Sequence, residues 1–168
     1  MLFQRRSGSK DSWPGALDVA VGGHLRAGES LAETVREAEE EIGLVLTLAD
    51  LTRLGRRFAH SVRGADNEVQ EVFALRSDLP LDRYRLHAEE VEGVVSIEFD
   101  DAIALFDGSL GAVPALELRR DAGSSVATPL DVAVSDFAAG ETGGYALRAL
   151  RGLRAVVDGR VPEPFELR

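Results

Sequence analysis

A mixed α/β or α+β domain is the fold class that the sequence predicts. Short apolar runs that suit β-strands are interspersed with segments of helical periodicity. The 168 residues favour one domain, two small ones at most, and the 45% apolar and 29% charged shares are ordinary for a soluble globular chain. The sequence shows no internal repeat, low-complexity tract or interdomain linker. These observations together predict one compact fold.

The predicted strands are short and bounded by turn residues. The first begins at once, over Leu2–Arg5, and a second covers Leu17–Val21 before a pair of glycines ends it. The remaining strands are predicted at Arg53–His60, at Glu68–Leu75, within Val91–Phe99, and as a hairpin of Ala115–Arg120 with Asp131–Val134.

Three segments have helical periodicity. Ser30 and Glu33 form a Ser-x-x-Glu capping box that opens a helix, and Gly43 supplies its C-terminal stop. The apolar stripe of this helix consists of Leu31, Val35, Ala38 and Ile42. The other two predicted helices run from a cap at Asp100-Asp101 to about Phe106, and over Tyr145–Val157.

Charge and composition exclude several classes of function. The net charge of −10 disfavours a partner that is a nucleic-acid polymer, since such partners need a basic surface. The absence of cysteine excludes disulfides, thiolate metal sites and thiol catalysis. No apolar stretch approaches the roughly 20 residues that span a bilayer, and the first residues lack the apolar region of a secretory signal. We therefore expect a cytoplasmic protein without a membrane partner.

The first predicted helix concentrates carboxylates beside its apolar stripe. At 100° per residue, Glu33, Glu37, Glu40 and Glu41 fall within roughly a quarter turn. Such an acidic face can be simply solvated. It can equally be a site for a hard cation such as Mg²⁺ or Mn²⁺, which prefers oxygen ligands and would cancel the repulsion between the carboxylates.

The segment around this helix resembles the box of the Nudix family, whose pattern is G-x5-E-x7-R-E-U-x-E-E-x-G-U with U an apolar residue. Residues 36–44, Arg-Glu-Ala-Glu-Glu-Glu-Ile-Gly-Leu, match every fixed position of the second half, and Gly23 and Glu29 match the first. Six residues separate Glu29 from Arg36, where the pattern has seven. We place the missing residue in the loop before the helix, because the cap and the apolar stripe are intact.

The resemblance implies an α/β/α sandwich around a mixed β-sheet. It also implies a site in which Glu37, Glu40 and Glu41 bind Mg²⁺ or Mn²⁺. Arg36 would hold a glutamate carboxylate in place. The supporting positions would be Glu29 and the glycines Gly22 and Gly23, one of whose carbonyls would add a ligand.

Other positions are similar to the branch of the family that contains isopentenyl diphosphate isomerase. The matching strings are Gln4-Arg5-Arg6-Ser7-Gly8-Ser9-Lys10, Trp13-Pro14-Gly15, Gly23-His24, Gly28-Glu29-Ser30 and Asn67-Glu68-Val69. This match puts Arg6 and Lys10, the sole lysine, where the isomerase grips the substrate diphosphate. It puts Asp66 and Glu68 on a pair of strand acids, and Glu68 is the first choice for a further metal ligand or general base.

A Mg²⁺-dependent pyrophosphohydrolase acting on a small nucleoside-diphosphate-type molecule is the predicted function. An isoprenoid diphosphate isomerase is the first alternative, but Gly22 stands where the isomerase has its cysteine. A non-catalytic Nudix domain that binds a ligand is the second, and the shortened box supports it. His24 is expected to be hydrogen-bonded locally rather than to bind metal.

The resemblance also divides the chain. It covers residues 1–107 as a Nudix core, and residues 108–168 are expected to form an extension, a hairpin plus a helix, packed on the same domain. Family members usually have a strand before the one that begins at Leu2. Either the true start lies upstream or this strand is missing, and a missing strand leaves a sheet edge open to pairing with another subunit. We therefore expect low solubility or a homodimer.

Overall fold

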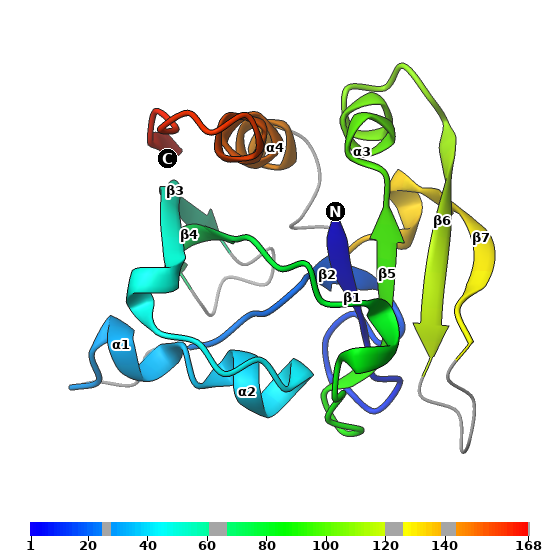
Figure 1. Cartoon of the computed structure of the whole chain (residues 1–168), viewed down its shortest axis with the longest axis horizontal. Coiled ribbons are helices and arrows are strands. Elements are labelled where there is room, and N and C mark those ends of the chain that lie inside the picture. Colours follow the sequence, from blue (N-terminus) through cyan, green and yellow to red (C-terminus); the bar gives the residue numbers. More distant parts are fainter. Residues whose placement is uncertain (25–27, 61–66, 120–125, 139–143, 168) are drawn as a thin grey trace.

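The structure is a computed structural model that describes residues 1–24, 28–60, 67–119, 126–138 and 144–167. These residues form two β-sheets and four α-helices (Figure 1). Within these residues, no helix has the length and apolar character needed to cross a membrane. The mixed α/β fold class predicted from the sequence is confirmed.

The larger sheet is antiparallel throughout, with strand order β2-β1-β5-β6-β7. Its strands are β1 (Leu2–Arg6), β2 (Leu17–Val19), β5 (Val91–Ile97), β6 (Ala112–Arg119) and β7 (Thr128–Ala133). The predicted hairpin is confirmed in β6 and β7, which pair antiparallel. Strand β1 pairs with β2 on one side and with β5 on the other, so the edges of this sheet are β2 and β7.

The smaller sheet is mixed, with strand order β4-β3-β8. Strands β3 (Leu51–His60) and β4 (Asn67–Leu75) are antiparallel, and β8 (Phe165–Leu167) pairs parallel to β3. The pairing of β3 with β4 shifts register beside Gly55, where a β-carbon would collide with the carbonyl oxygen of Phe165. Glycine at this position therefore lets the C-terminal strand approach β3.

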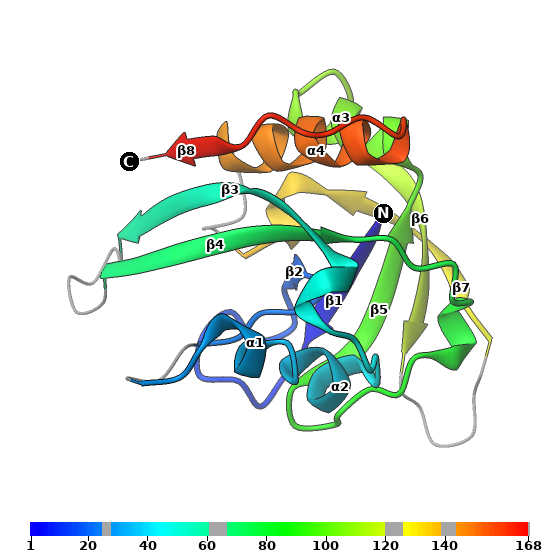
Figure 2. The same cartoon turned by 60° about the vertical axis from the view of Figure 1, so that its left-hand side comes forward.

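The smaller sheet lies between two helical layers. Figure 2 shows α4 (Gly144–Val157) on one side of β3 and β4, with α1 (Leu31–Thr34) and α2 (Glu37–Ile42) on the other. The remaining helix, α3 (Phe99–Phe106), lies between β5 and β6 in the chain. Its N-cap is Glu98, so Asp100 and Asp101 occupy its first turn rather than capping it as predicted.

The first predicted helix is interrupted, which corrects our placement of the missing box residue. The capping box is present, since the Glu33 carboxylate accepts hydrogen bonds from the Ser30 N–H (2.6 Å) and hydroxyl (2.8 Å). The cap follows Glu29 directly, which leaves no loop to shorten. Instead the α-helix is interrupted at Val35 and Arg36, which keep right-handed helical backbone angles, and it resumes at Glu37. The shortening therefore falls inside the helical segment.

Two apolar clusters hold the elements together. The larger packs the antiparallel sheet against α3 and α4, and its buried members include Phe3, Leu17, Val95, Leu105, Phe137 and Leu150. The smaller consists of Ile42, Tyr84 and Val91. It joins the end of α2 to the start of β5, and so fixes the box beside the turn that leads into β5.

Candidate active site

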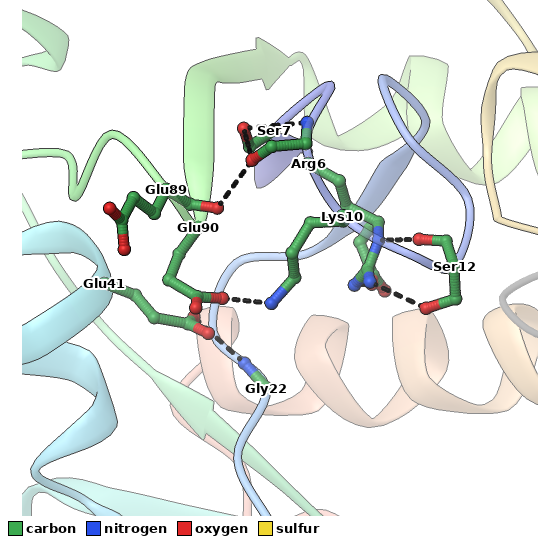
Figure 3. Close-up of polar contacts among 10 residues, drawn as sticks. Arg6, Ser7, Lys10, Ser12, Gly22, Glu41, Glu89 and Glu90 are labelled. Atoms are coloured by element: carbon green, nitrogen blue, oxygen red, sulfur yellow. Dashed lines mark hydrogen bonds and ion pairs between the residues drawn. The ribbon is translucent and has the colours of Figure 1, made fainter.

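Glu41 is the most enclosed acidic side chain of the box helix, with 7% of its surface exposed. Its carboxylate Oε2 accepts a hydrogen bond of 3.3 Å from the Gly22 N–H at the end of the segment after β2 (Figure 3). The pKa of Glu41 is raised to about 7, chiefly by burial and also by the charges of Glu37 and Glu90, while the Gly22 hydrogen bond and the charge of Lys10 oppose the rise. A buried carboxylate with acidic neighbours is stabilised by an added cation.

Lys10 donates to the Glu90 carboxylate beside Glu41 (Figure 3). The backbone holds this arrangement, because the Ser7 N–H donates to the Glu90 carbonyl at 2.9 Å and the Ser9 hydroxyl donates to the Glu89 carbonyl at 3.4 Å. The 7–10 loop therefore lies against the turn before β5. Sequence reasoning took Glu90 for a connector charge, and its place directly before a buried strand was the only signal available.

Arg6 closes the loop that carries Lys10. Its guanidinium donates to Asp18 (2.8 Å) and to the carbonyl and hydroxyl of Ser12 (both 3.0 Å). Neighbouring Arg5 donates to the Gly15 carbonyl at 2.9 Å and pairs with buried Glu117 on β6. The predicted diphosphate contact would require Arg6 to leave three bonds, whereas Lys10 would have to leave one.

Arg36 joins the two halves of the box. Its Nη2 lies 3.7 Å from Oε1 of Glu29, and its Nε lies 3.4 Å from Oε1 of Glu40. The break between α1 and α2 puts Arg36 at the N-cap of α2, from which it reaches both carboxylates. Glu40 is otherwise largely exposed, so this pair orients a side chain that would be free to rotate.

Glu68 lies on β4 and contacts the segment that precedes the box. Its Oε1 is 3.1 Å from Nε2 of His24, and its Oε2 accepts a bond of 2.9 Å from the Gln70 amide. The Gln70 bond lowers the pKa of Glu68, and His24 and Arg57 lower it further. Glu71 faces the other side of the strand and pairs with Arg53 and Arg56. Asp66 lies outside the described residues.

The metal-ligand set predicted from the sequence is not assembled in the described part of the chain. No group of three or more histidine, aspartate or glutamate side chains there is close enough to hold a metal ion. Glu37 and Glu90 nevertheless act electrostatically on Glu41. The donor chemistry, oxygen atoms of carboxylates around one buried carboxylate, fits a hard divalent cation.

Comparison with known proteins decides the family. The family sequence model described as the NUDIX domain matches residues 1–117 of this chain. The chain belongs to the Nudix family. Over 115 residues it is 30% identical to an uncharacterised Nudix hydrolase of Clostridium acetobutylicum, a match that covers 67% of this chain and 56% of that protein. It is 32% identical over 108 residues to Nudix hydrolase 3 of Arabidopsis thaliana, covering 60% and 14%.

The isomerase branch also has matches to this Nudix chain. The isopentenyl-diphosphate Delta-isomerase of Salmonella heidelberg is 35% identical over 96 residues, covering 54% of this chain and 50% of the isomerase. The crystal structure of DR0079 from Deinococcus radiodurans superposes with a TM-score of 0.48 at 27% identity, covering 64% of each chain. The chain thus spans about half, or less, of the length of the curated relatives named here.

Proposed function

We propose that this Nudix protein is a Mg²⁺-dependent pyrophosphohydrolase that cleaves a diphosphate linkage in a small nucleoside-diphosphate-type molecule. The observation that supports this most is the position of Glu41. It is the last acid of the box and is buried against Gly22, with an acid and a lysine from two other segments beside it. An acidic centre bordered by a cation is the arrangement that a metal-bound diphosphate requires.

In this proposal, Glu37, Glu40 and Glu41 hold the cation, Mg²⁺ or Mn²⁺, and Glu68 adds a carboxylate from β4. When bound, the cation supplies charge neutralisation on the diphosphate and lowers the pKa of the attacking water. Arg36 holds Glu40 toward the site through their 3.4 Å ion pair. Side chains around this centre bind the phosphate and accept the proton of the attacking water.

Lys10 is the side chain best placed to hold a phosphate. Its ion pair with Glu90 is partly exposed, and such pairs contribute at most about 1 kcal/mol. Lys10 can therefore exchange Glu90 for a phosphate oxygen at small cost. Glu90 is then released beside Glu41, which makes it a second carboxylate, after Glu68, able to accept the proton of the attacking water.

A substrate panel with matched variants tests the proposal. The protein is incubated with dinucleotides and sugar nucleotides in Mg²⁺ or Mn²⁺, and release of monophosphate is followed by chromatography. We expect Glu40→Gln and Glu41→Gln to abolish turnover while the circular dichroism spectrum is kept. Glu39→Gln changes an exposed acid of the same helix outside the fixed box positions and should leave the rate unchanged. Equal rates in all variants would contradict the assignment.

The isomerase alternative is supported by the similarity to isopentenyl-diphosphate Delta-isomerases. Carbon protonation and deprotonation need an acid–base pair, and Gly22, at the position of the family cysteine, offers only its N–H to Glu41. Product analysis with isopentenyl diphosphate and Mg²⁺ distinguishes the two reactions. Absence of both products, with ligand binding retained, would favour the non-catalytic domain. The cytoplasmic location, the homodimer and the domain boundary after residue 107 stay predictions.

A further inference from the structure

A continuous series of polar contacts crosses the smaller sheet from the C-terminal helix to the segment before the box. The guanidinium carbon of Arg57 on β3 lies 3.7 Å from the ring centroid of Tyr145 at the start of α4. Arg57 Nε donates to Oε1 of Gln70, its direct cross-strand neighbour on β4. The Gln70 amide nitrogen donates to Glu68, which contacts His24. The series therefore ends two residues from Gly22, the donor to Glu41.

The first member of this series is itself held in place. The Tyr145 ring packs edge-on against Phe165 with centroids 6.2 Å apart and an interplanar angle of 71°. Phe165 opens β8, which pairs parallel to β3 where Gly55 permits close approach. The position of the Tyr145 ring is thus set by two C-terminal elements, α4 and β8. Both lie beyond residue 117, where the match to the NUDIX domain ends.

The orientation of the Gln70 amide matters, because its oxygen can only accept hydrogen bonds and its nitrogen can only donate them. Arg57 is buried, with 9% exposed, and a guanidinium can only donate hydrogen bonds. The oxygen of Gln70 must therefore face Arg57, which turns its amide N–H group toward Glu68. Reversing the amide would set donor against donor at buried Arg57, which is unfavourable because both donors would be left without an acceptor. Arg57 in this way determines which way Gln70 presents its donor.

Glu68 is positioned from both sides as a result. One of its oxygens is taken by Gln70 and the other by His24, so the plane of the carboxylate is defined. Without the Gln70 bond, the partly exposed Glu68 would keep its contact with His24, a largely exposed side chain that constrains its rotamer less. The lowered pKa of Glu68, caused chiefly by the Gln70 hydrogen bond, agrees with this geometry.

We propose that Arg57 and Gln70 are positioning residues through which α4 holds the Glu68 carboxylate for the reaction. The C-terminal elements α4 and β8 then help to position a residue of the site, although they lie outside the match to the NUDIX domain. The catalytic consequence rests on the proposed function, because it assumes that Glu68 takes part in hydrolysis. The structural consequence, control of the Gln70 amide by Tyr145, does not.

The structural consequence is tested by NMR on the metal-free, ¹⁵N-labelled full chain. The side-chain amide of Gln70 is assigned by its loss in Gln70→Leu. We expect Tyr145→Leu and Arg57→Lys to shift this resonance, and Tyr145→Phe, which keeps the ring, to leave it in place. Arg154→Leu is the control, since it removes an α4 contact with Asp100 and the Phe99 ring that is not part of the series. An unmoved Gln70 resonance in Tyr145→Leu and Arg57→Lys overturns the inference.

The catalytic consequence is tested by kinetics on the same variants with the substrate that the panel identifies. We expect Tyr145→Leu and Arg57→Lys to lower kcat about tenfold with little change in KM, the size typical of residues that orient a functional ligand. In the double variant Gln70→Leu/Tyr145→Leu, kcat should be no lower than in Gln70→Leu alone. The loss of the Gln70 amide already removes the contact through which Tyr145 acts on Glu68.

The outcomes separate this inference from the proposed function. Additive losses in the double variant, or an equal loss in Arg154→Leu, would mean that α4 only stabilises the fold, and the inference would fail. If the wild type hydrolyses nothing, the proposed function fails, and the Gln70 resonance still decides whether Tyr145 controls the amide. If Tyr145→Leu does not fold, Arg57→Lys carries both tests.

Discussion

The Arg36 guanidinium lies 3.7 Å from the Glu29 carboxylate, although the segment between them is one residue shorter than the Nudix pattern. A missing residue in a continuous helix would rotate one partner by about 100° relative to the other. The break at Val35 and Arg36 absorbs that rotation, and Arg36 still reaches Glu29 and Glu40. The shortened box is therefore compatible with the ion pairs that orient its acids.

Insertion of one alanine after Thr34 tests this account of the break. The insertion restores the seven-residue spacing, and we expect α1 and α2 to join into one helix with greater helicity by circular dichroism. A glycine inserted at the same place is the matched control. If the inserted residue is helical, the alanine variant should be more stable to urea by about 1 kcal/mol. Equal stability of the two would show that the helix stays broken.

The pKa of Glu41 predicts how stability of the metal-free protein depends on pH. A carboxyl group whose pKa rises from 4.5 to about 7 on folding favours the folded state below pH 4.5. That stability is lost as the pH rises through about 7. Urea unfolding in a chelator should therefore show that Glu41→Gln gains stability relative to wild type between pH 5 and pH 8, by at most roughly 3 kcal/mol. A difference independent of pH would contradict a raised pKa.

Lys10→Gln separates phosphate binding from chemistry. Removal of the cation should raise KM about tenfold, while kcat changes less, because Lys10 is proposed to contact phosphate rather than the reacting atoms. Steady-state kinetics on the substrate that the panel identifies measures both. A fall in kcat with KM unchanged would assign Lys10 a different role.

Arg6→Ala distinguishes the loop contact seen in the structure from the predicted diphosphate contact. Loss of the bonds to Asp18 and Ser12 should lower the free energy of unfolding by about 2 kcal/mol and expose the 7–15 loop to proteolysis. Asp18→Asn should produce a similar change. An Arg6→Ala variant of wild-type stability with a raised KM would favour direct contact with substrate.

Much of the fold could be predicted because its signals are local. The periodicity of β3 and of α4 predicted their extents within two residues, and the Ser30–Glu33 box predicted the start of α1. The helix break could not be predicted, because Leu31, Val35, Ala38 and Ile42 keep helical spacing across it. The two partners of β1 could not be predicted either, since strand order depends on contacts between residues far apart in the sequence.

The sequence indicates the candidate residues that a motif carries and misses those that depend on tertiary contacts. The box indicates Glu41 and Glu37, and the charge of Glu37 acts on Glu41 in the structure. Glu90 looks like one of several connector acids in the sequence. The packing of Val91 on Ile42 brings it to the box helix, and the hydrogen bond from the Ser7 N–H to the Glu90 carbonyl brings Lys10 to it. The contacts of Arg57 with Tyr145 and Gln70 join three elements, and no pattern in the sequence indicates them.

Calorimetric titration with Mn²⁺ tests the central claim most directly, which is that Glu37, Glu40 and Glu41 bind one divalent cation. The account predicts saturable binding by the wild type and by Glu39→Gln, loss of that binding in Glu41→Gln, and tighter binding at pH 8 than at pH 6. Binding by Glu41→Gln equal to that of the wild type, or no binding by the wild type, would contradict it.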